Sequence, residues 1–197
     1  MRKIIESTLV SLDGVIGTPH LWAGDYFDKE AQQQALEQPL ASDAMLMGRR
    51  TYEIFAALWP GQAGDYADQV NSIRKYVFSS TLEKADWNNS EIIRGDVAAE
   101  VTKLKQQDGQ DLVIYGHGPL GQMLLEHHLL DELQLAVHPL LVGRGTPLFR
   151  AGGKTPSTSW RPRPSPQASS SCPTSRPEPD GRGPGAARHH RRNSGNT

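Results

Sequence analysis

The amino-acid sequence predicts an α/β fold in which a mixed, mainly parallel sheet lies between two layers of helices. Along residues 1–150, short apolar segments typical of strands alternate with longer segments of helical character. Several of the apolar segments are unbroken by polar residues, which is typical of strands buried on both faces. Strands that alternate with helices need crossover connections, and repeated crossovers build a parallel sheet covered by helices on both sides.

Six short segments rich in large apolar residues are predicted to be strands. The first precedes a turn signal at 11–14, and the second lies between Asp43 and Gly48. The fifth, Leu-Val-Ile-Tyr, is the clearest buried strand, and the sixth alternates until Pro139 stops it. In chain order the predicted strands span residues 4–10, 44–47, 76–78, 91–93, 112–115 and 133–137.

Four segments between these strands are predicted to be helices. The first is polar, rich in helix formers and bounded by Pro39, and the second ends at the turn 59–61. The third repeats apolar residues at 97, 101 and 104, the spacing of an amphipathic helix. The fourth has Pro119 in its first turn, where a missing N–H costs nothing. These helices span 28–38, 51–58, 97–104 and the residues that follow Gly118.

The composition divides the chain near Trp160. Residues 161–197 contain no Val, Ile, Leu, Met, Phe, Trp or Tyr, and their seven arginines against two acids give a charge of +5. The preceding 160 residues carry −6. A segment without large apolar residues cannot offset the entropy of ordering by burial. We therefore predict one folded domain at 1–160 and a disordered tail rich in proline, arginine and serine at 161–197.

Several classes of protein are excluded. No apolar run approaches the ~20 residues of a membrane-spanning helix, and Glu6 comes too early for a signal peptide. The single cysteine, Cys172, forms no internal disulfide, so we expect a cytoplasmic protein. His127 and His128 diverge on a helix and lack further ligands, so no metal site is predicted. The basic tail lacks aromatic residues that stack on bases, and we do not expect it to bind nucleic acid.

Three loops that follow predicted strands carry the candidate chemistry. Residues 48–51, Gly-Arg-Arg-Thr, begin a helix whose free N–H groups and two arginines suit a phosphate. The alternative, which these four residues alone favour, is an exposed arginine pair bound to Glu53 or to solvent. Residues 116–121 fit G-x-G-x-x-G, but no acidic residue ends the next strand, which favours a backbone cradle for pyrophosphate over a true Rossmann site. The hydroxyls at 79–81 are expected to cap a helix or to hold a phosphate or ribose.

Taken together, these segments resemble the dihydrofolate-reductase superfamily. The resemblance rests on the first strand and loop at 11–17, on Met-Gly-Arg-Arg-Thr-Tyr-Glu at 47–53 and on Arg-Lys-Tyr-Val-Phe-Ser-Ser at 74–80. The segment 139–149, Pro-Leu-Leu-Val-Gly-Arg-Gly-Thr-Pro-Leu-Phe, is similar to the reductase domain of bacterial riboflavin biosynthesis and its stand-alone relatives. Four ordered segments over about 150 residues are far more specific than any one motif.

The resemblance implies NADPH as the cofactor and assigns its parts to residues. The adenosine phosphate would lie along the loop 48–51, with an arginine selecting the 2′-phosphate, and serines would contact the adenosine half. The glycine loop would cradle the pyrophosphate, and the first loop would approach the nicotinamide. The implied cofactor residues are Gly48, Arg49, Arg50, Thr51, Ser79, Ser80, Gly116, His117, Gly118, Leu120, Gly121, Val15, Ile16 and Gly17.

The implied activity is the NADPH-dependent reduction of 5-amino-6-(5-phosphoribosylamino)uracil or a similar pyrimidine. The substrate is expected to be a small pyrimidine or pterin-like molecule. Asp13 is the candidate catalytic residue, as a polar contact for a pyrimidine or ribityl substrate, and the alternative is a turn aspartate that bonds its own backbone. The alternative functions are a dihydrofolate-reductase-like enzyme and a non-catalytic NADPH-binding protein with a damaged C-terminus. Relatives are often homodimers, so a homodimer is also expected.

The segment after Phe149 departs from the resemblance. Relatives continue there into strands that complete the sheet, whereas this chain has its proline- and arginine-rich stretch, as if a different reading frame were appended. An unpaired strand edge lowers stability and promotes aggregation. We therefore expect a lower urea midpoint than that of a relative with the usual C-terminal strands.

Overall fold

The computed structural model describes residues 1–24 and 40–149. The helix expected at 28–38, the tail at 161–197 and the chain that would complete the sheet after Phe149 lie outside the described residues. All six predicted strands are present, each within two residues of its expected start. They are β1 Ile4–Ser11, β2 Ser42–Gly48, β3 Arg74–Phe78, β4 Ser90–Ile93, β5 Asp111–Tyr115 and β6 Glu132–His138.

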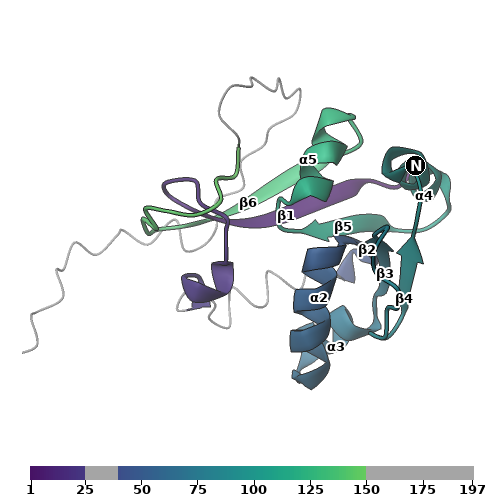
Figure 1. Cartoon of the computed structure of the whole chain (residues 1–197), viewed down its shortest axis with the longest axis horizontal. Coiled ribbons are helices and arrows are strands. Elements are labelled where there is room, and N and C mark those ends of the chain that lie inside the picture. Colours follow the sequence, from purple (N-terminus) through teal and green to yellow (C-terminus); the bar gives the residue numbers. More distant parts are fainter. Residues whose placement is uncertain (25–39, 150–197) are drawn as a thin grey trace, which may run out of the picture.

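The six strands form one sheet in the order β4-β3-β2-β5-β1-β6 (Figure 1). All five pairings between these strands are parallel. Within residues 1–24 and 40–149, the antiparallel contribution is an isolated bridge between Val15 and Pro147. The expected α/β fold with a mainly parallel sheet is confirmed.

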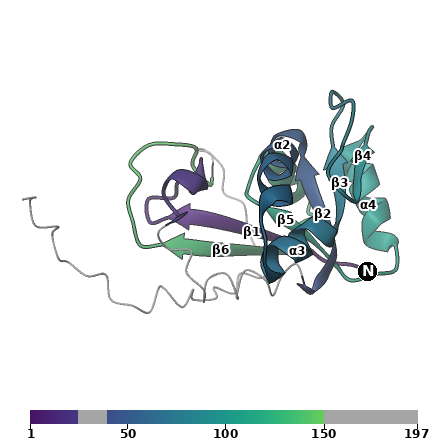
Figure 2. The same ribbon diagram turned by 90° about the horizontal axis from the view of Figure 1, so that it is seen from below.

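Helices cover both faces of this sheet. The helices α2 (Arg49–Leu58) and α3 (Asp65–Ser72) lie on one face, where Tyr52 and Val70 pack with Met45 and Val77. The helices α4 (Val97–Gln106) and α5 (Pro119–Glu126) lie on the other, where Val101 and Leu124 pack against further strand residues. Figure 2 shows α2 and α3 in front of the strands that they cover. Two short 3₁₀ helices, η1 Pro19–Leu21 and η3 Trp59–Gly61, complete the described elements.

The helices differ from the sequence-based expectation in two respects. Helix α2 begins at Arg49 and not at Thr51, so both arginines belong to its first turn. Helix α3 was not predicted, because its mostly polar sequence buries only Ala67 and Val70. Two buried residues three positions apart are too weak a signal of amphipathic periodicity.

Candidate functional site

All the predicted site residues lie at or after the carboxyl ends of strands. Because the six strands are parallel, these ends lie at one edge of the sheet. The strand order places the loops along this edge in the order 79–82, 48–51, 116–121 and 12–17, after β3, β2, β5 and β1 respectively. From the loop of β3 to that of β1 there are three strand spacings, about 14 Å. An extended ligand could therefore contact all four loops in turn.

A crevice is expected between β2 and β5. These strands are neighbours, yet the helices that follow them, α2 and α5, cover opposite faces of the sheet. Where two adjacent connections leave a parallel sheet in opposite directions, a space opens outside the strand ends, and this is where ligands bind in open α/β sheets. Gly48 and Gly116, the first residues of the two loops, flank this position.

Both helices that start at the crevice lack a side-chain cap. Gly48 caps α2 and Gly118 caps α5, and neither helix start receives a side-chain hydrogen bond. In contrast, the carboxylate of Asp96 accepts hydrogen bonds from Ala98 N and Ala99 N at the start of α4. Uncapped N–H groups carry partial positive charge and favour an anion. The two helix starts next to the crevice are thus suited to phosphate groups.

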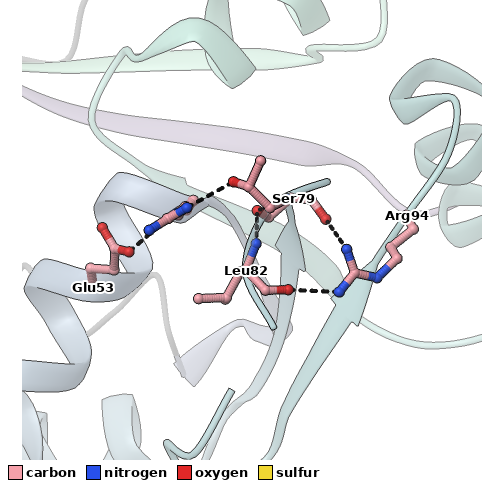
Figure 3. Close-up of polar contacts among 6 residues, drawn as sticks. Glu53, Ser79, Leu82 and Arg94 are labelled. Atoms are coloured by element: carbon pink, nitrogen blue, oxygen red, sulfur yellow. Dashed lines mark hydrogen bonds and ion pairs between the residues drawn. The ribbon is translucent and has the colours of Figure 1, made fainter. Parts of the chain in front are cut away.

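Three arginines lie at the β3 side of this edge. The guanidinium of Arg49 donates to Glu53 Oε1 at 2.7 Å and to Thr81 Oγ1 at 2.8 Å. Arg50 is exposed in the same helical turn. Arg94, after β4, donates to the backbone oxygens of Ser80 at 2.9 Å and Leu82 at 2.7 Å. Figure 3 shows Arg94 beside Ser79 and Leu82. Arg49 thus pairs with Glu53, as the alternative reading of the arginine pair expected, and remains half exposed beside the loop; phosphate binding stays a prediction.

The two predicted serines have different environments. Ser79 Oγ accepts hydrogen bonds from Thr81 N at 3.2 Å and Leu82 N at 2.9 Å, so it caps the turn after β3. Ser80 is exposed, and Arg94 holds its carbonyl. Ser79 therefore shapes the loop, whereas Ser80 is exposed and its contact with a ligand stays a prediction.

The loop 116–121 joins β5 to α5. Gly116 has a φ of 79°, a conformation that favours glycine. A Cβ atom on Gly118 would meet nothing within 4 Å, whereas a Cβ on Gly121 would collide with the carboxylate of Glu6. Leu120 packs against the core on the α5 face. Gly118 therefore borders open space at the crevice, whereas Gly121 is needed for packing inside the protein.

The first loop is fastened to the segment 145–148. Ile16 N donates to Thr146 O at 2.9 Å, and Leu148 N donates to Gly14 O at 2.8 Å. Val15 is buried, and a Cβ on Gly145 would approach its side chain to 2.6 Å. The Gly17 carbonyl accepts a hydrogen bond from Trp22 Nε1 at 2.8 Å. Of the three predicted nicotinamide contacts, Ile16 and Gly17 are partly exposed, whereas Val15 is buried.

Asp13 also binds this region, as a clamp on the loop after β6. Its carboxylate accepts hydrogen bonds from Gly143 N at 2.6 Å, Val142 N at 3.1 Å and the hydroxyl of Ser11. The Ser11 hydroxyl, followed by the N–H groups of Gly143 and Val142, lowers the pKa of Asp13 to about 2. Asp13 is therefore ionised at neutral pH, where it can accept a hydrogen bond from a substrate but cannot donate a proton.

The hydrogen bonds of Asp13 predict a pH-dependent stability. Its pKa in the folded chain, about 2, lies below the ordinary 3.8, so the carboxylate stabilises the fold above pH 3.8. This contribution is lost as the pH falls from 3.8 through 2. We expect the difference in unfolding free energy between the wild type and Asp13→Asn to be constant above pH 5 and to shrink towards pH 2. Urea unfolding across this range measures it, and a difference independent of pH would contradict the clamp.

The described residues also form a hollow away from the carboxyl edge of the sheet. A hollow of about 780 Å³ opens at the opposite, amino edge of the sheet, but its charged residues already pair, Asp43 with Arg2 and Arg74 with Glu91. Over the described ranges, no three His, Cys, Asp or Glu side chains cluster as metal ligands. In that same part of the chain, no helix has the length and apolar character needed to cross a membrane.

Sequence reasoning missed two residues of this region. Arg94 follows the end of β4, so the rule that singled out the other strand ends would have included it. Glu6 lies inside the apolar first strand and is fully buried beside His117. Its signal was a charged residue in a segment that is otherwise typical of a core strand.

The sheet order, the two helix layers and the edge that carries these loops define the class: this is an α/β protein with the dihydrofolate-reductase-like fold. The sequence pattern of the RibD C-terminal domain matches residues 2–169, and the chain belongs to this family. Two relatives come from Bacillus subtilis (strain 168) and are both called uncharacterized proteins. YyaP is 33% identical over 153 residues, which cover 75% of this chain and 80% of YyaP. YwjB is 28% identical over 151 residues, which cover 75% of this chain and 83% of YwjB.

Solved structures share the fold. A putative riboflavin biosynthesis protein from Shewanella sp. PV-4 superposes with a TM-score of 0.56 at 23% identity, over 79% of this chain and 86% of that one. The riboflavin biosynthesis reductase Rib7 of Saccharomyces cerevisiae superposes with a TM-score of 0.51 at 14% identity, over 77% of this chain and 80% of Rib7. At these identities the likeness concerns the fold.

Proposed function

We propose that the chain is an NADPH-dependent reductase of the riboflavin-pathway type. Its substrate would be 5-amino-6-(5-phosphoribosylamino)uracil or a similar small pyrimidine, and it would act in the cytoplasm. The observation that carries this proposal is the pair of helix starts without a side-chain cap, α2 after β2 and α5 after β5, which follow neighbouring strands of the sheet. Family membership supports a reductase, and the yeast structural neighbour is named as one.

The residues present fit this cofactor. Gly48, Gly116 and Gly118 border open space in which a Cβ atom would meet nothing within 4 Å, so a ligand can approach the backbone closely. The uncapped N–H groups of α2 and α5 suit phosphate oxygens, and Arg49 and Arg50 add positive charge on the β3 side. The order of the loops along the sheet edge agrees with the order of the adenosine phosphate, pyrophosphate and nicotinamide that the resemblance implies.

The roles of the chain's own residues follow from this arrangement. Arg49, with Arg50, would bind the 2′-phosphate, and the starts of α2 and α5 would hold the remaining phosphates. The loop fastened by Asp13 and Thr146 would wall the nicotinamide end and orient the substrate. When bound, NADPH supplies the hydride. Because Asp13 is ionised at neutral pH, the proton would come from water and Asp13 would accept a hydrogen bond from the substrate.

The proposal predicts that the full-length chain binds NADPH more tightly than NADH. Replacing Arg49 by alanine should weaken NADPH binding roughly 10- to 100-fold, the effect of losing a hydrogen bond to a charged group. Binding of NADH, which lacks the 2′-phosphate, should change little. Titrations read by nicotinamide fluorescence measure both affinities.

Glu53→Gln is the matched control for this titration. It preserves the size of the side chain and removes the charge that competes for Arg49. NADPH binding should stay the same or become tighter. A folded wild-type chain that binds neither nucleotide would contradict the cofactor assignment.

Activity assays then separate the alternative functions. Oxidation of NADPH with the phosphoribosylamino-pyrimidine supports the leading proposal, and oxidation with dihydrofolate supports the dihydrofolate-reductase-like alternative. Tight binding without turnover of either substrate supports a non-catalytic NADPH-binding protein. A homodimer remains a prediction that sedimentation of the full-length chain would test.

A further inference from the structure

A fully buried carboxylate lies directly beneath the loop 116–121. Glu6 is in β1, an interior strand, and its side chain is 0% exposed. Its Oε1 atom accepts a hydrogen bond from Thr8 Oγ1 at 3.1 Å and lies 2.7 Å from His117 Nδ1. Its Oε2 atom has no hydrogen-bond partner among the described residues. A carboxylate so placed has lost its hydration and is costly unless a cation or strong donor accompanies it.

His117 is the neighbour that can compensate this charge. Its side chain is only 7% exposed, and its ring contacts Glu6, the position of Gly121 and Phe149. Of these three contacts only Glu6 can carry a charge. A carboxylate oxygen only accepts, so we assign the hydrogen of this contact to Nδ1, which donates it to Glu6. This bond fixes the rotation of the ring.

The position of His117 in the chain determines what its second ring nitrogen, Nε2, can contact. The residue lies between Gly116 and Gly118, in the loop that begins α5 at the crevice. With Nδ1 turned to Glu6, Nε2 is on the opposite edge of the ring. Within residues 1–24 and 40–149, the structure shows no hydrogen bond from Nε2. A protonated imidazole has donors at both nitrogens, so it can bridge a carboxylate and a phosphate.

We propose that Glu6 is a positioning residue that holds His117 so that the Nε2–H of its imidazolium donates to a pyrophosphate oxygen of the dinucleotide. This inference rests on the proposed function and deepens it. The proton on Nε2 comes from solvent when the dinucleotide binds, and the imidazolium then lies between two anions, the buried carboxylate and the phosphate. Glu6 itself never touches the ligand.

Nitrogen NMR of the full-length chain, with His117→Gln to assign the signals, tests the positioning. In the wild type without nucleotide, the His117 Nδ1 signal should be that of a protonated nitrogen in a strong hydrogen bond, and Glu6→Gln should abolish this signature. On addition of NADPH, Nε2 should become protonated as well. His127, an exposed histidine after α5, is the internal control and should not respond. The Nε2 response of the wild type needs no variant, so it decides the proposal even where Glu6→Gln fails to fold.

A double-mutant cycle tests whether Glu6 acts through His117. Glu6→Gln and His117→Gln should each weaken NADPH binding about 10-fold, and the double variant should be no weaker than either single one. If the loss of NADPH affinity in the double variant equals the product of the two single losses, Glu6 does not act through His117 and the proposal is overturned. A Glu6→Gln variant that binds NADPH as tightly as the wild type would overturn it too. A wild type that binds no NADPH refutes the proposed function. Inorganic pyrophosphate then replaces the nucleotide as the probe, and an unresponsive Nε2 refutes the His117 donor.

Discussion

Replacement of Gly121 by alanine is expected to lower the free energy of unfolding by about 2–3 kcal/mol. The added Cβ would collide with Glu6 Oε2 and lie 3.2 Å from His117 Nδ1. Overpacking of a buried position costs about 1–3 kcal/mol, and displacing a paired buried carboxylate adds to this. The better helix propensity of alanine returns about 1 kcal/mol. Urea unfolding of the full-length chain measures the sum.

Gly118→Ala is the matched control. This position begins the same helix, has a φ of −95° and has no atom within 4 Å of the new methyl group. Its unfolding free energy should fall by less than about 1 kcal/mol, the scale of a changed N-cap. If the proposed function holds, this variant should instead weaken NADPH binding, because the methyl group occupies the cradle. Similar losses of stability at both positions would contradict the collision with Glu6.

Measuring Gly121→Ala in two variants of Glu6 shows whether the collision with Glu6 causes the loss of stability. In Glu6→Ala the carboxylate is gone, so the new methyl group has space, and the cost of Gly121→Ala should fall by at least about 1 kcal/mol. In Glu6→Gln the side chain keeps its shape, and the cost should remain. If Gly121→Ala lowers the unfolding free energy equally in Glu6→Ala and in Glu6→Gln, the collision with the Glu6 carboxylate is not the cause of the loss.

The sheet and the edge at which the candidate loops lie could be predicted from the sequence because they depend on local signals. Unbroken apolar segments identified the strands, and their alternation with helices implied parallel pairing. Parallel pairing brings all the strand ends together, so the loops at 48–51 and 116–121 could be placed at one edge before their partners were known. Family resemblance then supplied the roles that spacing alone does not indicate.

The contacts of Glu6 with His117 and of Asp13 with Gly143 could not be predicted, because they depend on how the strands align in the sheet. Glu6 aligns with Ile114 in the pairing of β1 with β5, and this register brings its side chain beneath His117, 111 residues away. In the same way, Asp13 reaches the backbone of Gly143 only because β6 lies beside β1. A shift of one residue would turn Glu6 to the other face of the sheet. Register is set by the whole packed core, and no local pattern reports it.

Lys75 is the buried charge for which we expect the largest loss of stability on replacement. It lies in β3 with 0% exposure, and its ammonium donates to the carbonyls of Asn71, Ile73 and Asn88 at 2.7, 2.8 and 3.1 Å. The three N–H groups are therefore matched by three acceptors, and the Trp87 ring lies 4.2 Å from Nζ. These contacts join the end of α3 to the segment before β4.

Lys75→Ala should lower the free energy of unfolding by about 3–5 kcal/mol, since it leaves a cavity and buried carbonyls without donors. Lys75→Met fills most of the cavity and should lose less. The exposed Lys84, paired with Asp86, is the control, and its replacement by alanine should change stability by no more than about 0.5 kcal/mol. A Lys75→Ala variant as stable as Lys84→Ala would show that the three hydrogen bonds only balance the cost of burying the charge.

The pH dependence of the unfolding free energy gives a second comparison between the hydrogen bonds of Lys75 and the cost of burying its charge. Burial lowers the pKa of Lys75 from 10.5 to about 8, so between these values the folded chain binds fewer protons at this site than the unfolded chain. Stability rises with pH wherever the unfolded state binds more protons. The advantage of the wild type over Lys75→Met should therefore increase from pH 8 to pH 10.5 and stay constant below pH 7. An advantage that falls over this window would mean that the three carbonyls and Trp87 hold the proton more strongly than burial expels it.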